Sequence, residues 1–121
     1  MPTRVLIADD SHLFCDAIEL ILDADERIEV VGRALDGAQA VTLARELDPD
    51  IVLLDLSMPG VGGIEAIRAM LRDDTRRRVL VLTGSSDPVD RKKARDAGAV
   101  GYLTKEQIGD ELIPGVLEAA R

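Results

Sequence analysis

The segment Ile51-Val52-Leu53-Leu54-Asp55 decides the fold, because four consecutive apolar residues run directly into a carboxylate. A short apolar run of this kind is typical of a strand that is buried on both faces of a parallel sheet. The same design occurs near the amino terminus, where Val5–Ala8 is followed by Asp9. It occurs again where Val79–Leu82 is followed by Thr83. These three runs predict central strands, each ending in a polar residue.

Two weaker apolar runs, Ile28–Val31 and Val100–Leu103, fit strands at the edges of the sheet. Helical patterns lie between the strands, with apolar residues spaced three and four apart. The stripes are Phe14, Ala17, Ile18, Ile21 and Leu22; Ala40, Val41, Ala44 and Leu47; Ile64, Ile67 and Leu71; and Leu112 or Ile113 with Val116, Leu117 and Ala120. The stretch from Asp87 to Ala97 has the thinnest stripe, although a capping Asp, a Pro and a closing Gly98 mark its bounds. Pro114 is expected in the first turn of the last helix.

Five repeats of strand then helix predict an α/β fold of the flavodoxin-like (βα)5 type. The expected five-stranded parallel sheet has the order 2-1-3-4-5, with helices on both faces. We expect one domain over residues 1–121, with a ligand site at the carboxyl ends of the first and third strands.

The composition excludes several classes of function. Of 121 residues, 46% are hydrophobic and 31% charged, which is globular, and the net charge of −8 argues against direct binding of nucleic acid. The aromatic residues are only Phe14 and Tyr102, too few for a base-stacking platform. Cys15 and His12 are the only residues of their types, so a disulfide within the chain is excluded. No apolar run approaches the length of a membrane span, and we expect a cytoplasmic protein without membrane contact.

The predicted strand ends supply three carboxylates, a hydroxyl and an ammonium. These are Asp9, Asp10, Asp55, Thr83 and Lys105. Two carboxylates about 4 Å apart repel each other by roughly 4 kcal/mol at an effective dielectric constant of 20. A cation relieves that repulsion, and a small set of oxygen ligands with room for water suits Mg²⁺.

Each of these residues also has an ordinary structural explanation. Asp10 could cap a helix that starts at Ser11, and Asp55 could belong to a turn. Thr83 could be a plain strand residue and Lys105 a solvated surface group. Suitable groups at four separate strand ends are nevertheless much rarer by chance than any one of them.

The chain resembles the receiver domain of two-component response regulators over essentially its whole length. The resemblance is carried by Val5-Leu6-Ile7-Ala8-Asp9-Asp10, Ile51-Val52-Leu53-Leu54-Asp55-Leu56-Ser57-Met58-Pro59-Gly60, Leu82-Thr83-Gly84 and Gly98-Ala99-Val100-Gly101-Tyr102-Leu103-Thr104-Lys105. The segment 58–68 looks most like the subgroup in which a LuxR-type helix-turn-helix domain follows the receiver. The chain is thus expected to be either a stand-alone receiver or one piece of a longer regulator.

The resemblance implies that Asp55 accepts a phosphoryl group from a phosphohistidine of a sensor histidine kinase. It implies Mg²⁺ as the cofactor, bound directly by Asp10, Asp55 and the backbone carbonyl of Ser57, with Asp9 acting through water. Positioning and charge stabilisation suffice for such a transfer.

The resemblance further implies that Lys105 pairs with one phosphoryl oxygen and that Thr83 hydrogen-bonds another. Tyr102 would then swing into the space that Thr83 vacates. This changes the surface of the helix over 87–97, the fifth strand and the last helix, which would control an output domain or a partner. A homodimer could form on phosphorylation, and DNA would be reached only through an output domain. Self-phosphorylation from a donor and slow autodephosphorylation would be the only catalysis, so the protein is not a conventional enzyme.

Two other functions remain open. An aspartyl-nucleophile phosphatase usually carries a second Asp two residues after the nucleophile, where this chain has Ser57. A receiver-like interaction module that is never phosphorylated would not need the full set of site residues. A flavin-binding protein is a weaker idea, because the first strand leads into two aspartates rather than a phosphate-binding loop.

Some positions depart from the family pattern or need a separate explanation. Glu106 follows Lys105 where many receivers have a cis proline, which leaves the geometry of this bond open. The basic residues within 91–95 and the run Arg76-Arg77-Arg78 are expected to be solvated charge clusters, although the first could contact an acidic partner. His12 is expected to be structural.

Overall fold

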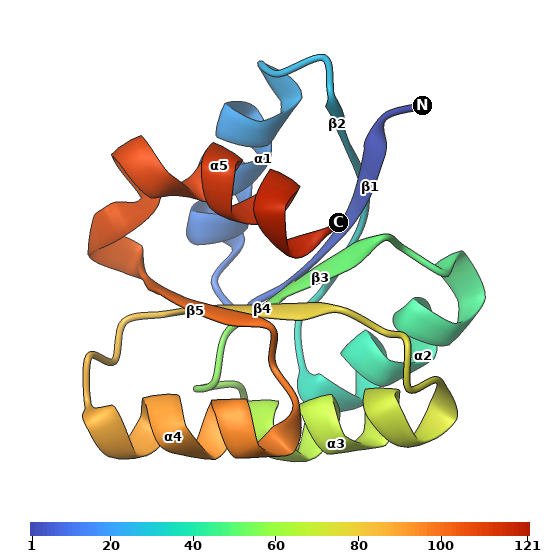
Figure 1. The fold of residues 1–121 in the computed structure, drawn as a ribbon, viewed down its shortest axis with the longest axis vertical. Helices are drawn as coiled ribbons and strands as arrows, with labels where there is room; N and C mark the ends of the chain where they lie inside the picture. Colours follow the sequence, from blue (N-terminus) through green and yellow to red (C-terminus); the bar gives the residue numbers. More distant parts are fainter.

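Five parallel strands form one sheet in the order β2-β1-β3-β4-β5, with helices on both faces (Figure 1). The computed structural model describes residues 1–121. Its elements are β1 (Thr3–Ala8), α1 (His12–Asp23), β2 (Ile28–Ala34), α2 (Gly37–Leu47), β3 (Ile51–Leu54), α3 (Gly63–Asp73), β4 (Val79–Thr83), α4 (Pro88–Ala97), β5 (Gly101–Thr104), a 3-10 turn (Lys105–Gln107) and α5 (Ile108–Ala119). The predicted fold class and strand order are confirmed.

The helices form two layers that enclose the sheet. Helices α1 and α5 lie on one face, while α2, α3 and α4 lie on the other (Figure 1). Each layer has its own buried cluster. Ile18, Leu22 and Leu112 belong to the first, and Ala66 and Ile67 belong to the second. Successive residues along a strand point their side chains to opposite faces of the sheet, so both layers draw apolar residues from β1 and β3.

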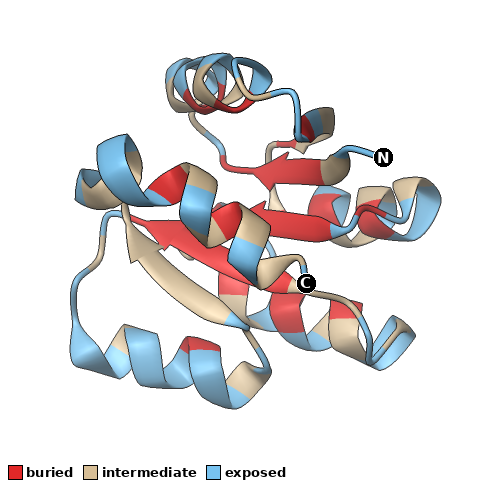
Figure 2. Cartoon of the chain, turned by 45° about the horizontal axis from the view of Figure 1, so that its top comes forward, coloured by how far each residue is buried: buried red, intermediate tan, exposed pale blue.

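The strands differ in burial across the sheet. Every residue of β3 and β4 is buried, whereas every residue of β5 is only half-buried (Figure 2). The two weaker apolar runs are indeed the outer strands, β2 and β5. Strand β2 is longer than predicted and reaches Ala34, with a register shift opposite Val5 and Leu6. Its last residues, Gly-Arg-Ala, carry no apolar alternation that a sequence pattern could detect.

Capping residues set the helix bounds near the sheet edge. Asp87 accepts a hydrogen bond from the Val89 N–H at the start of α4, and Gly98 ends that helix with φ +114°. Helix α5 starts earlier than the apolar stripe indicates, because Gln107 Oε1 accepts from the Thr104 N–H at 2.8 Å and initiates a 3-10 turn. Pro114 therefore lies inside α5, beyond the first turn where it was expected.

The amino-terminal rim of the sheet corrects one expectation. The Arg77 side chain is only 8% exposed, and its Nη1 lies 2.9 Å from Asp48 Oδ1. The same nitrogen donates to the Pro49 carbonyl at 3.1 Å. Arg77 thus joins the α2–β3 and α3–β4 connections and is not part of a solvated cluster, whereas Arg76 is largely exposed. None of the helices has the length and apolar character that spanning a bilayer would require.

Candidate functional site

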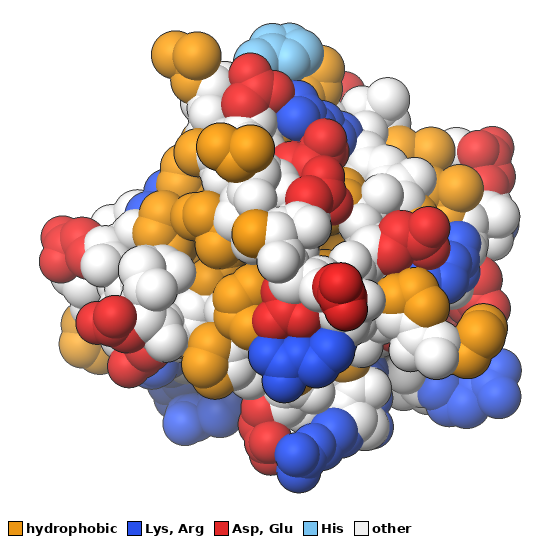
Figure 3. Space-filling model, turned by 90° about the horizontal axis from the view of Figure 1, so that it is seen from above, with side chains coloured by type: hydrophobic (Ala, Val, Ile, Leu, Met, Phe, Trp, Pro, Cys, Tyr) orange, Lys and Arg blue, Asp and Glu red, His pale blue; other side chains and the backbone are white.

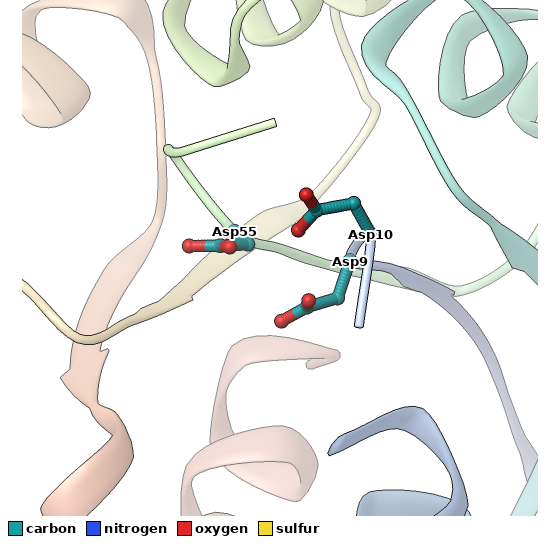
Figure 4. Close-up of side chains that lie close together, drawn as sticks. All are labelled: Asp9, Asp10 and Asp55. Atoms are coloured by element: carbon teal, nitrogen blue, oxygen red, sulfur yellow. The ribbon is translucent and has the colours of Figure 1, made fainter. Parts of the chain in front are cut away.

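Three aspartates meet at the carboxyl ends of β1 and β3, where the sequence predicts a site. One carboxylate oxygen from each of Asp9, Asp10 and Asp55 lies within 4.8 Å of the others (Figure 4). The backbone fixes this arrangement, since the Asp55 N–H donates to the Ala8 carbonyl at 2.9 Å and the Asp9 N–H to Ala34 at 3.0 Å. Asp9 and Asp55 are buried, while Asp10 is exposed.

The Lys105 ammonium enters this acidic cluster from the end of β5. Its Nζ lies 2.8 Å from Asp9 Oδ2 and 3.7 Å from Asp55 Oδ2. The shorter contact is an ion pair, and Asp9 Oδ2 has no hydrogen-bond partner beside it. Burial lowers the pKa of Lys105, but the contact with Asp9 and the charges of the nearby aspartates outweigh it and raise the pKa overall. One ammonium therefore offsets part of the charge of three carboxylates.

Ser11 organises the start of α1 beside this cluster. Its N–H donates to Asp9 Oδ1 at 2.9 Å, and its Oγ accepts from the Phe14 N–H at 3.2 Å. Ser11 is therefore the residue that caps α1, and the alternative explanation of Asp10 as a helix cap is wrong. The exposed Asp10 carboxylate faces the other two aspartates instead (Figure 4).

Phe14 is a site residue that sequence reasoning missed. Lys105 Nζ lies 4.0 Å from the centroid of its ring, within the range of a cation–π contact. In the sequence, Phe14 reads only as the first member of an apolar stripe. The spacing between residues 14 and 105 carries no signal that the two side chains meet.

Ser57 and Thr83 complete the set of predicted groups near Asp55. The Ser57 N–H donates to Asp55 Oδ1 at 3.4 Å, a long contact that leaves this carboxylate weakly held by its own turn. Thr83 ends β4 and is fully buried, yet its Oγ1 has no hydrogen-bond partner. An unpaired buried hydroxyl is costly, and Thr83 Oγ1 is therefore free to hydrogen-bond a further group.

Tyr102 lies in β5, away from the acidic cluster. Its hydroxyl donates to the Ser85 carbonyl at 2.8 Å, and the Arg91 guanidinium lies 4.6 Å from its ring centroid. Burial is the largest cause of a raised Tyr102 pKa. Arg91 is thus engaged with the ring and is not simply solvated. The bond between Lys105 and Glu106 is trans, because the chain has no cis peptide bond.

The oxygen atoms of the cluster fit a hard divalent cation. Three carboxylates lie close together, two of them buried, and only one ammonium opposes their charge. The cluster contains neither the thiolate nor the imidazole ligands that zinc prefers, and Mg²⁺ is bound through carboxylates and waters. The site is therefore chemically suited to Mg²⁺.

Comparisons with known proteins agree with this chemistry. The response regulator receiver domain family matches residues 5–116. The chain is 38% identical over 120 residues to the nitrate/nitrite response regulator protein NarP of Escherichia coli, covering 99% of this chain and 56% of NarP. It is 36% identical over 118 residues to the transcriptional regulatory protein LiaR of Bacillus subtilis, covering 98% of this chain and 56% of LiaR. The chain spans about half the length of the curated relatives it matches.

Solved structures give the same result. The response regulator domain of CheB from Thermotoga maritima superposes with a TM-score of 0.93 at 30% identity, covering 99% of this chain and 97% of that one. A two-component response regulator of the LuxR family from Aurantimonas superposes with a TM-score of 0.95 at 33% identity, covering 99% and 86% of the two chains.

Proposed function

Because the chain belongs to the response regulator receiver domain family, we propose that Asp55 accepts a phosphoryl group and that this switches the surface of α4, β5 and α5. The predicted likeness to LuxR-type regulators is confirmed, since a LuxR-family regulator is among its structural neighbours. One observation carries the proposal. One carboxylate oxygen from each of three aspartates lies within 4.8 Å of the others, and the Lys105 ammonium lies 3.7 Å from Asp55 Oδ2.

In the proposed step, an Asp55 carboxylate oxygen attacks the phosphorus of a phosphohistidine. The new P–O bond forms as the P–N bond breaks, and the electron pair of that bond returns to the imidazole nitrogen of the kinase. Water later attacks the aspartyl phosphate, which releases inorganic phosphate and restores the carboxylate. For this transfer the protein mainly has to align the reacting groups and stabilise the charge on the phosphoryl oxygens.

Asp10, Asp55 and the Ser57 carbonyl are the groups that we propose hold Mg²⁺ directly, with Asp9 acting through water. Asp9 suits this indirect role because its two oxygens already face the Ser11 N–H and the Lys105 ammonium. When bound, Mg²⁺ supplies positive charge that neutralises phosphoryl oxygens.

Lys105 and Thr83 are the groups that we propose contact the phosphoryl oxygens. The Lys105 ammonium lies near Asp55 without a hydrogen bond to it, and Thr83 Oγ1 has no partner to give up. Both can therefore form new bonds when phosphoryl oxygens appear. Tyr102 would move as Thr83 moves, and its displacement would carry the change to the outer surface.

Receiver domains of response regulators are phosphorylated by histidine kinases, so a sensor histidine kinase is the partner that we propose. The phosphorylated surface would act on an output domain, a partner or a second copy of the chain. Contact with DNA would belong to such an output domain. We propose that residues 1–121 form one receiver unit that works in the cytoplasm, and that its only catalysis is its own phosphorylation and slow dephosphorylation.

An intact-mass measurement tests the proposal. The protein is incubated with Mg²⁺ and acetyl phosphate as a small phosphoryl donor, and the expected result is the added mass of one phosphoryl group. Asp55→Asn should abolish the gain, whereas Asp110→Asn, a change at an exposed aspartate in α5, should preserve it. No gain with any donor or kinase would favour the interaction module. Continuous release of phosphate from added phosphoesters would favour the aspartyl phosphatase.

A further inference from the structure

The Lys105 ammonium has three close partners, the carboxylates of Asp9 and Asp55 and an aromatic ring. Its Nζ lies 2.8 Å from Asp9 Oδ2 and 4.0 Å from the centroid of the Phe14 ring. A cation near the face of a ring is attracted by the ring quadrupole, and the attraction grows when water is partly excluded. The Lys105 side chain is only 27% exposed, so this contact is partly shielded.

Backbone contacts fix the ring and the carboxylate relative to each other. The Ser11 N–H donates to Asp9 Oδ1, and Ser11 Oγ accepts from the Phe14 N–H. Asp9, Ser11, Phe14 and Lys105 therefore form a closed ring of contacts. The contacts of Ser11 at the start of α1 thus fix the positions of Asp9 and Phe14 relative to each other.

The Lys105 ammonium lies where it could contact an oxygen of a phosphoryl group on Asp55. At 3.7 Å from Asp55 Oδ2, Lys105 Nζ is beside the acceptor but too far away for a hydrogen bond. The lysine side chain is flexible and strongly hydrated, so with its two carboxylate partners alone it would spend more time in solvent. The Phe14 ring restricts this freedom without contacting either carboxylate oxygen of Asp55, the proposed phosphoryl acceptor.

We propose that Phe14 is a positioning residue for phosphoryl transfer, because its ring holds the Lys105 ammonium beside Asp55 before the phosphoryl group arrives. This inference rests on the function proposed above. It assigns a task to a residue that otherwise reads as part of the α1 packing surface. Holding a charge in place beforehand speeds a reaction because less reorganisation is left for the transition state.

The kinetic test compares three substitutions in α1. Phe14→Leu removes the π face and keeps an apolar side chain, whereas Phe14→Tyr keeps the π face. Ile21→Val is the control, because Ile21 is also half-buried and packs against the same cluster. The rate of phosphorylation by acetyl phosphate should fall roughly 3- to 30-fold in Phe14→Leu, the range that cation–π energies correspond to. It should stay close to the parent rate in the other two proteins.

Two further measurements separate positioning from a general structural effect. The ε-methylene protons of Lys105 should show an upfield ring-current shift by NMR in the parent and in Phe14→Tyr, and should lose it in Phe14→Leu. The rise in melting temperature at a fixed Mg²⁺ concentration should be the same in all four proteins. Phe14→Met fills a similar volume without a π face, and it repeats the comparison if Phe14→Leu does not fold.

The outcomes distinguish this inference from the proposed function. If the parent is phosphorylated and Phe14→Leu reacts at the parent rate, the inference is overturned and the role of Asp55 stands. If Phe14→Tyr is as slow as Phe14→Leu, the ring face is not what matters and the inference is again overturned. If the parent takes up no phosphoryl group at all, the proposed function fails and this inference fails with it.

Discussion

The centre of the sheet and its β5 edge hold the two parts of the proposed switch in different ways. Strands β3 and β4 are completely buried and end in or next to Asp55 and Thr83, where the chemistry is proposed to occur. At the edge, no residue of β5 is fully buried, and Ala94 is the only buried residue of α4 (Figure 2). Segments with few buried apolar contacts open most easily. The difference suggests that the fold keeps the reacting groups rigid and leaves the surface that would report the reaction free to move.

The largest expected effect on the free energy of unfolding comes from making the same side-chain truncation, Leu to Ala, in each of the two regions. Leu54→Ala in β3 should lower the free energy of unfolding by about 2–5 kcal/mol, because it leaves a cavity in a fully packed site. Leu103→Ala in β5 removes the same atoms from a half-buried position and should cost about half as much or less. Urea unfolding of both variants measures this. Equal losses would mean that the edge is packed as firmly as the centre.

The next effect is the response of the two regions to Mg²⁺. A cation that binds only the folded state should raise the free energy of unfolding by about 2.7 kcal/mol at a hundred times its dissociation constant. Asp10→Asn in the central cluster should lose most of this gain. Without metal, however, this variant should melt at a higher temperature than the parent, because the negative charge at residue 10 no longer repels the other two aspartates. Asp87→Asn at the edge keeps a capping side chain and serves as the control. Thermal melts with and without Mg²⁺ decide, and the proposed site is misplaced if Asp10→Asn responds like the parent.

A third, smaller difference concerns local opening. Amides in α4 should exchange with solvent at least about tenfold faster than those in α1, which corresponds to about 1.4 kcal/mol. Phosphorylation should change the α4 rates more than those of any other helix. Hydrogen exchange followed by mass spectrometry measures both states. Equal protection of the two helices before phosphorylation, together with unchanged α4 rates afterwards, would remove α4 from the output surface.

The smallest effect should come from a single hydroxyl at the edge. Tyr102→Phe removes the hydrogen bond to the Ser85 carbonyl, and a bond of this kind contributes about 0.5–1.5 kcal/mol. Because Tyr102 is only half-buried, we expect the lower end of that range and a few-fold faster exchange in α4. Val100→Ala, at a neighbouring exposed position, should leave the exchange unchanged. If Tyr102→Phe also leaves it unchanged, this hydrogen bond does not restrain α4.

The distribution of surface charge does not identify the proposed output surface of α4, β5 and α5. Acidic, basic and apolar side chains are interleaved on the face seen from above, the side on which α1 and α5 lie (Figure 3). The basic residues of α4 are also partly engaged within the molecule, since Arg91 lies over Tyr102 and Lys92 pairs with Asp96 at 2.8 Å. The contrast in burial between centre and edge is therefore the better guide to movement.

Local patterns were sufficient to predict the sheet and the acidic cluster. An apolar run that ends in Asp55 specifies both a buried strand and the end at which its carboxylate stands, because parallel strands share one carboxyl edge. The same reasoning brought Asp9 and Asp10 beside it. Helix α4 was also bounded correctly, since capping by Asp87 and the positive φ of Gly98 are local properties.

What the sequence did not indicate depends on contacts between distant residues. Phe14 and Lys105 meet only because α1 and the end of β5 approach the same cluster. Arg77 reads as one of three surface arginines until Asp48 and Pro49 are seen to enclose it. The early start of α5 depends on a side-chain bond from Gln107, which outweighs the position of the apolar stripe.

The strand order also has a consequence for how the protein folds while it is being synthesised on the ribosome. Strand β1 is made first but lies between β2 and β3, so it stays half-paired until residues 51–54 have been synthesised. Once residue 55 has been added, Asp9, Asp10 and Asp55 can meet, whereas Lys105 has not yet been made. The growing chain therefore assembles its like charges before it acquires the ammonium that offsets them, and residues 1–73 alone would carry the whole repulsion. Nascent chains halted after α3 should consequently fold more readily when Mg²⁺ is present, and the finished protein should depend on it less.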